Sequence, residues 1–212
     1  MKLKAKTLAA AAAMALAAAA MPAAAVDVYT FDSTDVGAFG AGPYGTITLT
    51  QSGTAVNFKV DLRSDLNFVT TGKAGSKAVF TFNATGVAAG DITNIVDASN
   101  QTFSVVSPGN NSPFGAFTFG LLCATNCDNG GSGGGYPDPL TFTVANSVLA
   151  DFALKSLGGA YFAADAIQVN GGATGAIGAT SVTTPVPEPE TYALMLAGLG
   201  AMGFVARRRK KA

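Results

Sequence analysis

The sequence predicts a mainly β protein whose body is an antiparallel β-sandwich of jelly-roll-like or immunoglobulin-like type. Short runs alternate Thr with Val, Ile or Phe, and turns rich in Gly, Asn, Ser and Pro separate these runs. No βαβ rhythm and no repeat of fixed period accompanies them. We expect three parts, namely residues 1–25, a body over 26–183, and residues 184–212. A body of roughly 160 residues is long enough for a two-sheet core.

The clearest pair of strands lies in "TITLTQSGTAVNFKVDL", residues 46–62. Ile47 and Leu49 alternate with threonines, and Val56, Phe58 and Val60 alternate with polar residues. Because successive side chains of a strand point to opposite faces, each run has one apolar and one wet face. The intervening "QSGT" supplies turn residues, so the stretch predicts a hairpin.

Six further runs repeat this composition and are predicted as strands. They cover residues 78–82, 102–106, 115–122, 140–144, 161–169 and 175–182. The run over 161–169 contains one charged residue, Asp165, in an otherwise mainly apolar strand. We expect Asp165 to lie on the solvent face or to bond a turn, because an unpaired carboxylate is rarely buried.

The charge pattern argues against a nucleic-acid partner. The whole chain is formally neutral, but residues 26–187 contain five Lys or Arg against eleven Asp and no Glu, which gives a net charge of −6. Phosphate binding needs a basic footprint, and the body has none.

Composition also argues against catalysis. The chain contains no His, which removes Ser-His-Asp and Cys-His chemistry and His-based zinc sites. The body has no Glu either, so only Asp remains for acid–base work, as in a glycosidase. Asp61 and Asp65 in "DLRSD" are the closest candidates, and at a strand end we expect them to meet water. We therefore predict no enzymatic activity, no cofactor and no metal site.

A carbohydrate-binding module is an alternative for the body. Such sites favour aromatic platforms, but Trp is absent from the chain. The polar aromatics of the body are Tyr29, Tyr44, Tyr136 and Tyr161.

The two cysteines, Cys123 and Cys127, frame "CATNC". In an exported protein such a pair predicts a disulfide, here closing a very small loop. A metal site would need more ligands than two thiols. The Gly-rich stretch from Asn129 predicts a flexible surface loop. Asp128, Asn129 and Asp138 flank it, and calcium binding there is an alternative without EF-hand spacing.

The first 25 residues have the features of a secretory signal peptide. Three lysines precede an apolar stretch from Thr7 to Met21, and Ala23-Ala24-Ala25 follows. Small residues at Ala23 and Ala25 satisfy the cleavage rule, so we place the cut after Ala25. The alternative is an amphipathic or buried alanine helix, but the stretch has no polar face.

Residues 192–206 are uncharged and predict a short transmembrane helix. Its 15 residues would rise ~22 Å, against a hydrocarbon core of ~30 Å. A basic tail over 207–212 follows and would stay on the cytoplasmic side, which leaves the body outside. A core helix is the alternative, although its many small residues would pack poorly. The basic stop consists of Arg207, Arg208, Arg209, Lys210 and Lys211.

Just before this segment stand Pro187, Glu188 and Pro189. The two prolines cannot donate backbone hydrogen bonds and hold the chain extended. "TTPVPEPET" also has the composition of an ordinary linker. The triplet, the short apolar run and the basic block together resemble the PEP-CTERM sorting signal of Gram-negative envelope proteins, over Val186 to Lys211.

That resemblance implies processing at or near the triplet by an exosortase, a membrane-embedded enzyme with a cysteine nucleophile. The family is associated with exopolysaccharide, biofilm and floc formation. The strand carrying "FAADAI" and the following "GAIGA" loosely resemble the last strands of such proteins, and we interpret them as a terminal hairpin.

We therefore expect an exported protein, held transiently at the inner membrane and then moved to the cell surface or matrix. There it would be structural or adhesive, with extracellular polysaccharide as a partner. A carbohydrate-binding module and a permanently anchored periplasmic protein are the alternatives.

Overall fold

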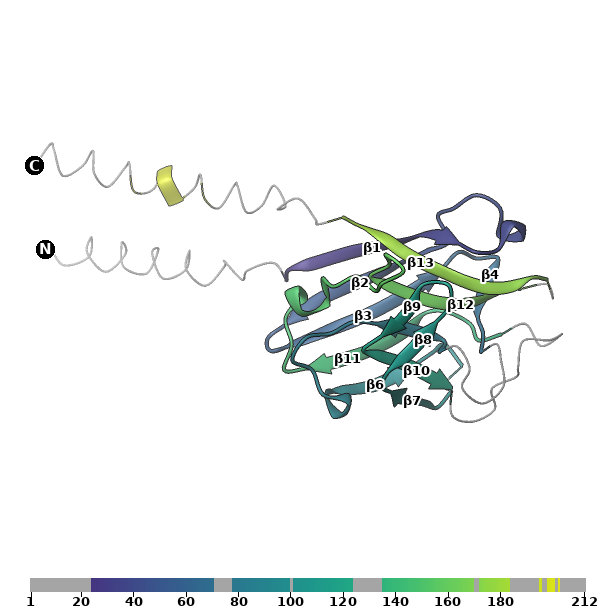
Figure 1. The fold of residues 1–212 in the computed structure, drawn as a ribbon. Helices are drawn as coiled ribbons and strands as arrows, with labels where there is room; N and C mark the ends of the chain where they lie inside the picture. Colours follow the sequence, from purple (N-terminus) through teal and green to yellow (C-terminus); the bar gives the residue numbers. More distant parts are fainter. Residues whose placement is uncertain are drawn as a thin grey trace, which may run out of the picture. The chain divides into compact units, whose positions relative to one another are not determined.

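The computed structural model describes residues 24–70, 78–99, 101–123, 135–169 and 172–183, together with 195, 198–200 and 202. Ala25–Thr184 form one compact unit, which is the body of the protein (Figure 1). Ala23, Cys127, the triplet Pro187–Pro189 and the basic block lie outside the described residues. No helix within the described part of the chain is both long and apolar enough to cross a membrane. Most of the predicted span over 192–206 lies outside that part.

The described body consists of short strands and three single-turn 3₁₀ helices. The strands are β1 (Val26–Thr34), β2 (Gly45–Ser52), β3 (Ala55–Leu62), β4 (Leu66–Phe68), β5 (Phe80–Phe82), β6 (Ile92–Val96), β7 (Phe103–Val106), β8 (Gly109–Asn111), β9 (Gly115–Phe117), β10 (Phe119–Cys123), β11 (Leu140–Ala145), β12 (Phe162–Gln168) and β13 (Thr174–Thr183). The 3₁₀ helices are η1 (Gly37–Phe39), η2 (Ala89–Asp91) and η3 (Leu149–Phe152).

One antiparallel sheet contains all strands except the small hairpin β8–β9. Its order is β6-β11-β3-β2-β1-β13-β12-β5-β10-β7, and β4 pairs with β12 beside this path. The two end strands, β6 and β7, follow each other in the chain and approach each other in space, so the sheet is nearly closed and barrel-like. The predicted mainly β, antiparallel body is confirmed. The strands form one curled sheet, however, because β1 and β13 pair and join the two halves that a sandwich would keep apart.

The predicted hairpin is confirmed as β2 and β3. Ile47 pairs with Val60 and Leu49 pairs with Phe58, and all four side chains point into the core. The threonines between them point outward, as the alternation requires.

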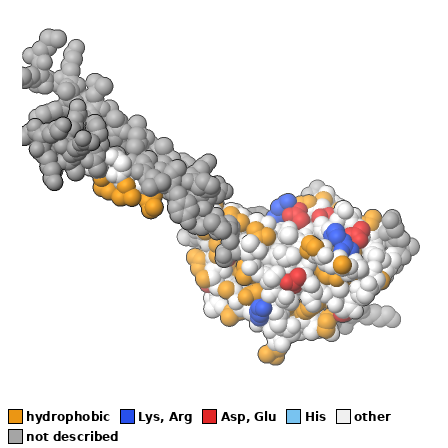
Figure 2. All heavy atoms as spheres, turned by 90° about the horizontal axis from the view of Figure 1, so that it is seen from above, with side chains coloured by type: hydrophobic (Ala, Val, Ile, Leu, Met, Phe, Trp, Pro, Cys, Tyr) orange, Lys and Arg blue, Asp and Glu red, His pale blue; other side chains and the backbone are white. Residues whose placement is uncertain are grey.

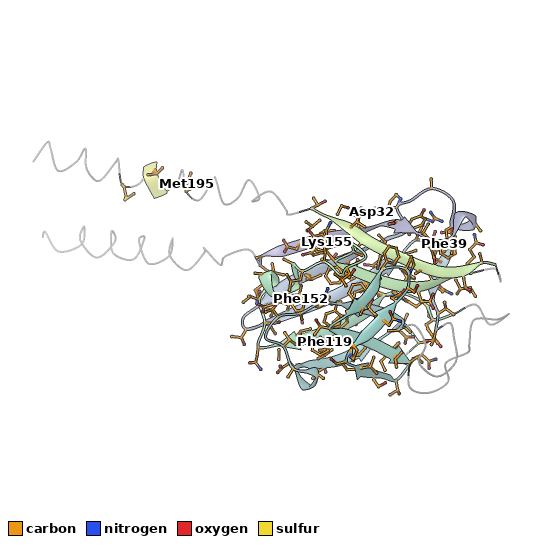
Figure 3. All side chains as sticks on the ribbon, viewed as in Figure 1. Asp32, Phe39, Phe119, Phe152, Lys155 and Met195 are labelled. Atoms are coloured by element: carbon orange, nitrogen blue, oxygen red, sulfur yellow. The ribbon has the colours of Figure 1, made fainter. Side chains whose placement is uncertain are left out.

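Phenylalanine rings fill the interior of the curled sheet. Phe58 is 2 % exposed and stacks on Phe142 with ring centroids 4.4 Å apart. The edge of Phe152 meets the same ring at 4.8 Å. Phe119 and Phe152 also lie in this interior (Figure 3). Burial of so much aromatic surface is the main favourable term in the stability of the body.

β12 and the part of β13 from Gly175 to Ala179 are buried on both faces. Phe162 and Ala164 of β12 face the main core, whereas Ala163 belongs to a second, small cluster with Phe114 and Phe117 from the β8–β9 region. Asp165 lies on the same face as Ala163 and is 0 % exposed. The prediction of a solvent-facing Asp165 is therefore wrong, because this outer face is covered.

Candidate functional site

The acidic side chains of the body were the first candidates for chemistry. Six of the described aspartates accept hydrogen bonds from backbone N–H groups, at 2.8 to 3.1 Å. They are Asp32, Asp35, Asp91, Asp97, Asp138 and Asp151. Carboxylates used in this way fix turns and strand ends. Since they cap separate segments of the chain, they do not converge on one reaction centre.

Asp61 and Asp65, the pair singled out from the sequence, form two separate ion pairs. Lys59 Nζ lies 2.8 Å from Asp61 Oδ1 on the outer face of β3. Arg63 donates to both carboxylate oxygens of Asp65, with Nη2 to Oδ2 at 2.9 Å. This contact lowers the pKa of Asp65, chiefly through the hydrogen bond from Arg63. Each aspartate is thus paired with a cation of its own, and the two do not form a pair of neighbouring carboxylates.

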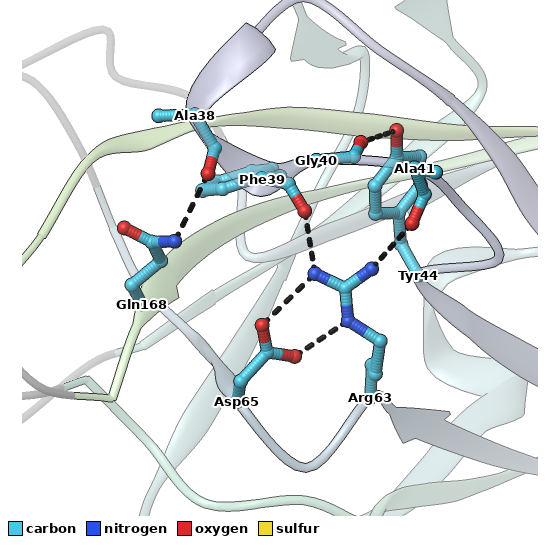
Figure 4. A network of polar contacts seen from close by, with 8 residues as sticks. All are labelled: Ala38, Phe39, Gly40, Ala41, Tyr44, Arg63, Asp65 and Gln168. Carbon is cyan, nitrogen blue, oxygen red and sulfur yellow. Dashed lines mark hydrogen bonds and ion pairs between the residues drawn. The ribbon is translucent and has the colours of Figure 1, made fainter.

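Arg63 is the centre of a network of polar contacts at the end of β3 (Figure 4). Its Nη2 donates to the carbonyl of Phe39 at 2.6 Å, and its Nη1 donates to the carbonyl of Ala41 at 2.8 Å. The guanidinium carbon lies 5.3 Å from the centre of the Tyr44 ring. A planar guanidinium suits such a fork of acceptors. Arg63 therefore clamps the loop that contains η1 onto the end of β3.

Tyr44 and Gln168 complete this network. Tyr44 donates its hydroxyl to the carbonyl of Gly40 at 2.8 Å, and Gln168 Nε2 donates to the carbonyl of Ala38 at 3.1 Å (Figure 4). The sequence did not predict this network, although one feature of the composition points to Arg63. Arg63 is the sole arginine between residues 26 and 187.

A shallow hollow of about 190 Å³ adjoins the network and is lined by Asp65, Gln168, Val169 and Gly172. The charge of Asp65 is neutralised by Arg63, and both ends of the Gln168 amide are bonded to backbone. A second hollow, of about 280 Å³, lies beside Thr54, Asn146, Val148 and Asp151. Neither hollow combines an enclosed apolar wall with several unengaged polar groups, as small-molecule sites do.

Aromatic side chains offer no platform for a sugar ring in the described part of the body. All but two of them are buried, and the exceptions, Phe103 and Tyr161, are half-buried. Lys155 covers Tyr161, with its ammonium 4.7 Å from the ring centre. Three of the four polar aromatics, Tyr29, Tyr44 and Tyr136, belong to the core.

Asp27 and Tyr29, two residues apart on β1, both have raised pKa values. Burial raises the pKa of Asp27. Burial, followed by the charge of Asp27 and the neighbouring Tyr161, raises the pKa of Tyr29 to about 12. A phenol with so high a pKa stays protonated at neutral pH, so it does not act as a base. The Tyr29 ring packs edge-on against Phe162 and has a structural role.

Of the other predicted sites, the structure describes three residues. The carbonyl of Ala25 accepts a hydrogen bond from the backbone N–H of Gln51 at 2.9 Å. Cys123 ends β10, and because Cys127 lies outside the described residues, their disulfide stays a prediction. Asp138 accepts from the N–H of Leu62, and no group of three potential metal ligands occurs among the described residues.

Comparison with protein families identifies the segment that follows the body. Residues 185–210 match the PEP-CTERM protein-sorting motif. The resemblance seen in the triplet, apolar run and basic block is thereby confirmed. The motif implies export, processing by an exosortase and sorting to the cell envelope or surface. Neither the curated proteins nor the solved structures include a significant match to the chain.

Proposed function

We propose that this is a non-enzymatic surface or matrix protein, delivered by exosortase and structural or adhesive in extracellular polysaccharide. The observation that carries the proposal is the sorting motif at residues 185–210. It is supported by a body in which eight of the ten described aspartates are engaged in backbone caps or ion pairs. Such a body serves as a stable module to be delivered.

Each part of the sorting segment has a physical task in this proposal. Arg207 to Lys211 resist transfer across the bilayer, because burying charge in hydrocarbon is costly. The short run over 192–206 holds the chain only marginally, which suits temporary anchoring at the inner membrane. Pro187 and Pro189 keep Glu188 extended, so that the exosortase can bind the triplet as a strand. Removal of the tail then frees the body for the cell surface or matrix.

The outer face of β1, β2, β3 and β11 supports polysaccharide as the partner. Threonine is the most frequent residue on this face, and its cation Lys59 is paired with Asp61. Charged side chains are also few and scattered on the body as seen from above (Figure 2). A surface rich in threonine hydroxyls, whose cation is paired with a carboxylate, suits an uncharged polymer rich in hydroxyls. Its threonines are Thr30, Thr46, Thr48, Thr50, Thr141 and Thr143.

Replacement of Pro187, Glu188 and Pro189 by alanines tests the sorting step. In a host with an exosortase, we expect the variant to accumulate at full tail length in the inner membrane, while the natural protein loses its tail. Intact-mass analysis of envelope and medium fractions gives the measurement. Equal masses and locations would show a permanently anchored periplasmic protein instead, with the triplet as a linker.

The disulfide is proposed together with this export route. Because the chain matures in an oxidising compartment, Cys123 and Cys127 should resist alkylation unless a reductant is added. Labelling of two thiols in the exported protein without reductant would contradict it.

A further inference from the structure

The predicted signal-cleavage site lies at the very start of the folded sheet. The bond to be cut joins Ala25 to Val26, the first residue of β1. The carbonyl of Ala25 already accepts the N–H of Gln51 at 2.9 Å, and Val26 pairs with Thr50. The folded body therefore engages the carbonyl that a peptidase would have to activate.

The residues that follow the bond are held still more firmly. β1 is a central strand, paired with β2 from Val26 onward and with β13 from Val28 onward. Tyr29 and Phe31, on its inner face, are buried in the core. A protease binds its substrate as an extended strand and needs the same backbone groups that β2 occupies. Binding to the peptidase and pairing in the sheet thus exclude each other.

At the other end of the body, the last strand is β13. β13 ends at Thr183, and Pro187 follows four positions later. Val28 is the last partner of β13 in the β1 ladder, at Thr183. The sorting triplet follows β13 in the sequence and lies outside the described residues.

We infer that signal cleavage has to precede the docking of β1 into the sheet. Hydrolysis adds water across the Ala25–Val26 amide, with the hydroxyl going to the carbonyl carbon and a proton to the nitrogen. The new ammonium group at Val26 then begins β1, and the sheet closes as β13 pairs with β1. The inference rests on cleavage after Ala25 and is independent of the sorting proposal.

A spacer variant tests this order of events. Ser-Gly-Ser-Gly is inserted between Ala25 and Val26 in the full-length precursor, which leaves β1 intact and moves the bond away from Gln51. Both precursors are folded in detergent and treated with signal peptidase, and the mass of the products is followed in time. We expect the folded natural precursor to be cut at least about tenfold more slowly than the spacer variant, because local opening must come first.

Two peptides covering residues 10–40, with and without the spacer, serve as matched controls that cannot form the sheet. Both should be cut after Ala25 at similar rates. Equal rates for the two folded precursors would overturn the inference. So would a natural peptide that is not cut after Ala25, since the bond would then be the wrong one.

Discussion

Two parts of the same sheet differ in how many of their faces are buried. In β3 and β11 buried and exposed side chains alternate, and only the inner face is covered. In β12 six successive residues are buried, from Phe162 to Ile167. The difference comes from β8 and β9, whose hairpin region covers the outer face of β12 and β13 through Phe114 and Phe117. Strands of one sheet therefore need not share one pattern of burial.

In β12 and β13 the second layer packs on small residues. Ala163, Ala176 and Gly178 line the outer face of β12 and β13, where the ring of Phe114 packs. A Cβ atom at Gly178 would overlap that ring. The one-faced part has no such restriction, because its outer side chains project into water. Substitutions should consequently be tolerated on one part and rejected on the other.

The largest expected effect comes from the core that both parts share. Phe58 contacts Phe142, Phe152 and Phe162, so it joins β3 to β11, η3 and β12. Phe58→Ala should lower the free energy of unfolding by about 3–5 kcal/mol, through lost burial and the cavity left behind. Urea denaturation followed by circular dichroism measures it.

The neighbouring Asn57 is the matched control for this substitution. It is exposed on the outer face of β3. Asn57→Ala should change stability by no more than about 0.5 kcal/mol. An equal loss in both variants would contradict the assignment of inner and outer faces.

The next effect tests the covered part alone. Gly178→Ala should cost about 1–3 kcal/mol, because the added methyl forces the Phe114 ring to move. The cost should shrink when Phe114→Leu is already present, and a double-mutant cycle by urea denaturation measures this coupling. Gly37→Ala is the control, since a Cβ at Gly37 meets nothing within 4 Å. An unchanged cost in the Leu background would show that the ring is not the obstacle.

How far the sequence predicts this difference depends on the kind of pattern. Alternation in residues 46–62 and 140–144 predicted β2, β3 and β11 and their inner faces. A strand with one face in water alternates polar and apolar residues, and this period of two is visible in the sequence. The Ala- and Gly-rich stretches of β12 and β13 have no such period, so they do not reveal that a second layer covers them. The buried position of Asp165 was missed for the same reason.

The polar network was also beyond prediction from local pattern. Arg63 donates to the carbonyls of Phe39 and Ala41, which lie more than twenty residues earlier. Backbone carbonyls are present at every position, so no residue type marks these two as partners. Only the path of the folded chain brings them to the guanidinium.

A smaller effect on stability is expected at the Arg63 network, which lies between the end of β3 and Gln168 of β12. Arg63→Lys removes the planar fork and should cost about 1–2 kcal/mol. The loop with η1 should then exchange its amide hydrogens faster, while β11 stays protected. Lys59→Arg, on the outer face of β3, is the control and should change neither stability nor exchange. Unchanged exchange in the Arg63 variant would show that the loop does not depend on the clamp.

The smallest effect lies at the junction of β1 and β13, which joins the two parts. The ladder is irregular there, and Asp32 Oδ1 accepts from both the N–H and the hydroxyl of Thr180 at 2.9 Å. Burial raises the pKa of Asp32, but hydrogen bonds from Ser181 and Thr180 outweigh it and lower the pKa. A lowered pKa means that the ionised carboxylate stabilises the fold above its unfolded-state pKa, and that this contribution is lost as the pH falls through the folded-state pKa. Because Asp32 is exposed, Asp32→Asn should cost only about 0.5–1 kcal/mol at pH 7.

The pH dependence distinguishes this junction from the inner face of the same strand. The difference in urea midpoint between the natural protein and Asp32→Asn should shrink as the pH is lowered below about 4. Asp27 has a pKa raised by burial, so its ionised form opposes folding at neutral pH. Asp27→Asn should therefore raise stability slightly at pH 7, and this gain should vanish as the natural carboxylate becomes protonated. Asp27→Asn and Asp32→Asn should therefore shift stability in opposite directions at pH 7. A shift in the same direction would contradict the different environments of the two carboxylates on β1.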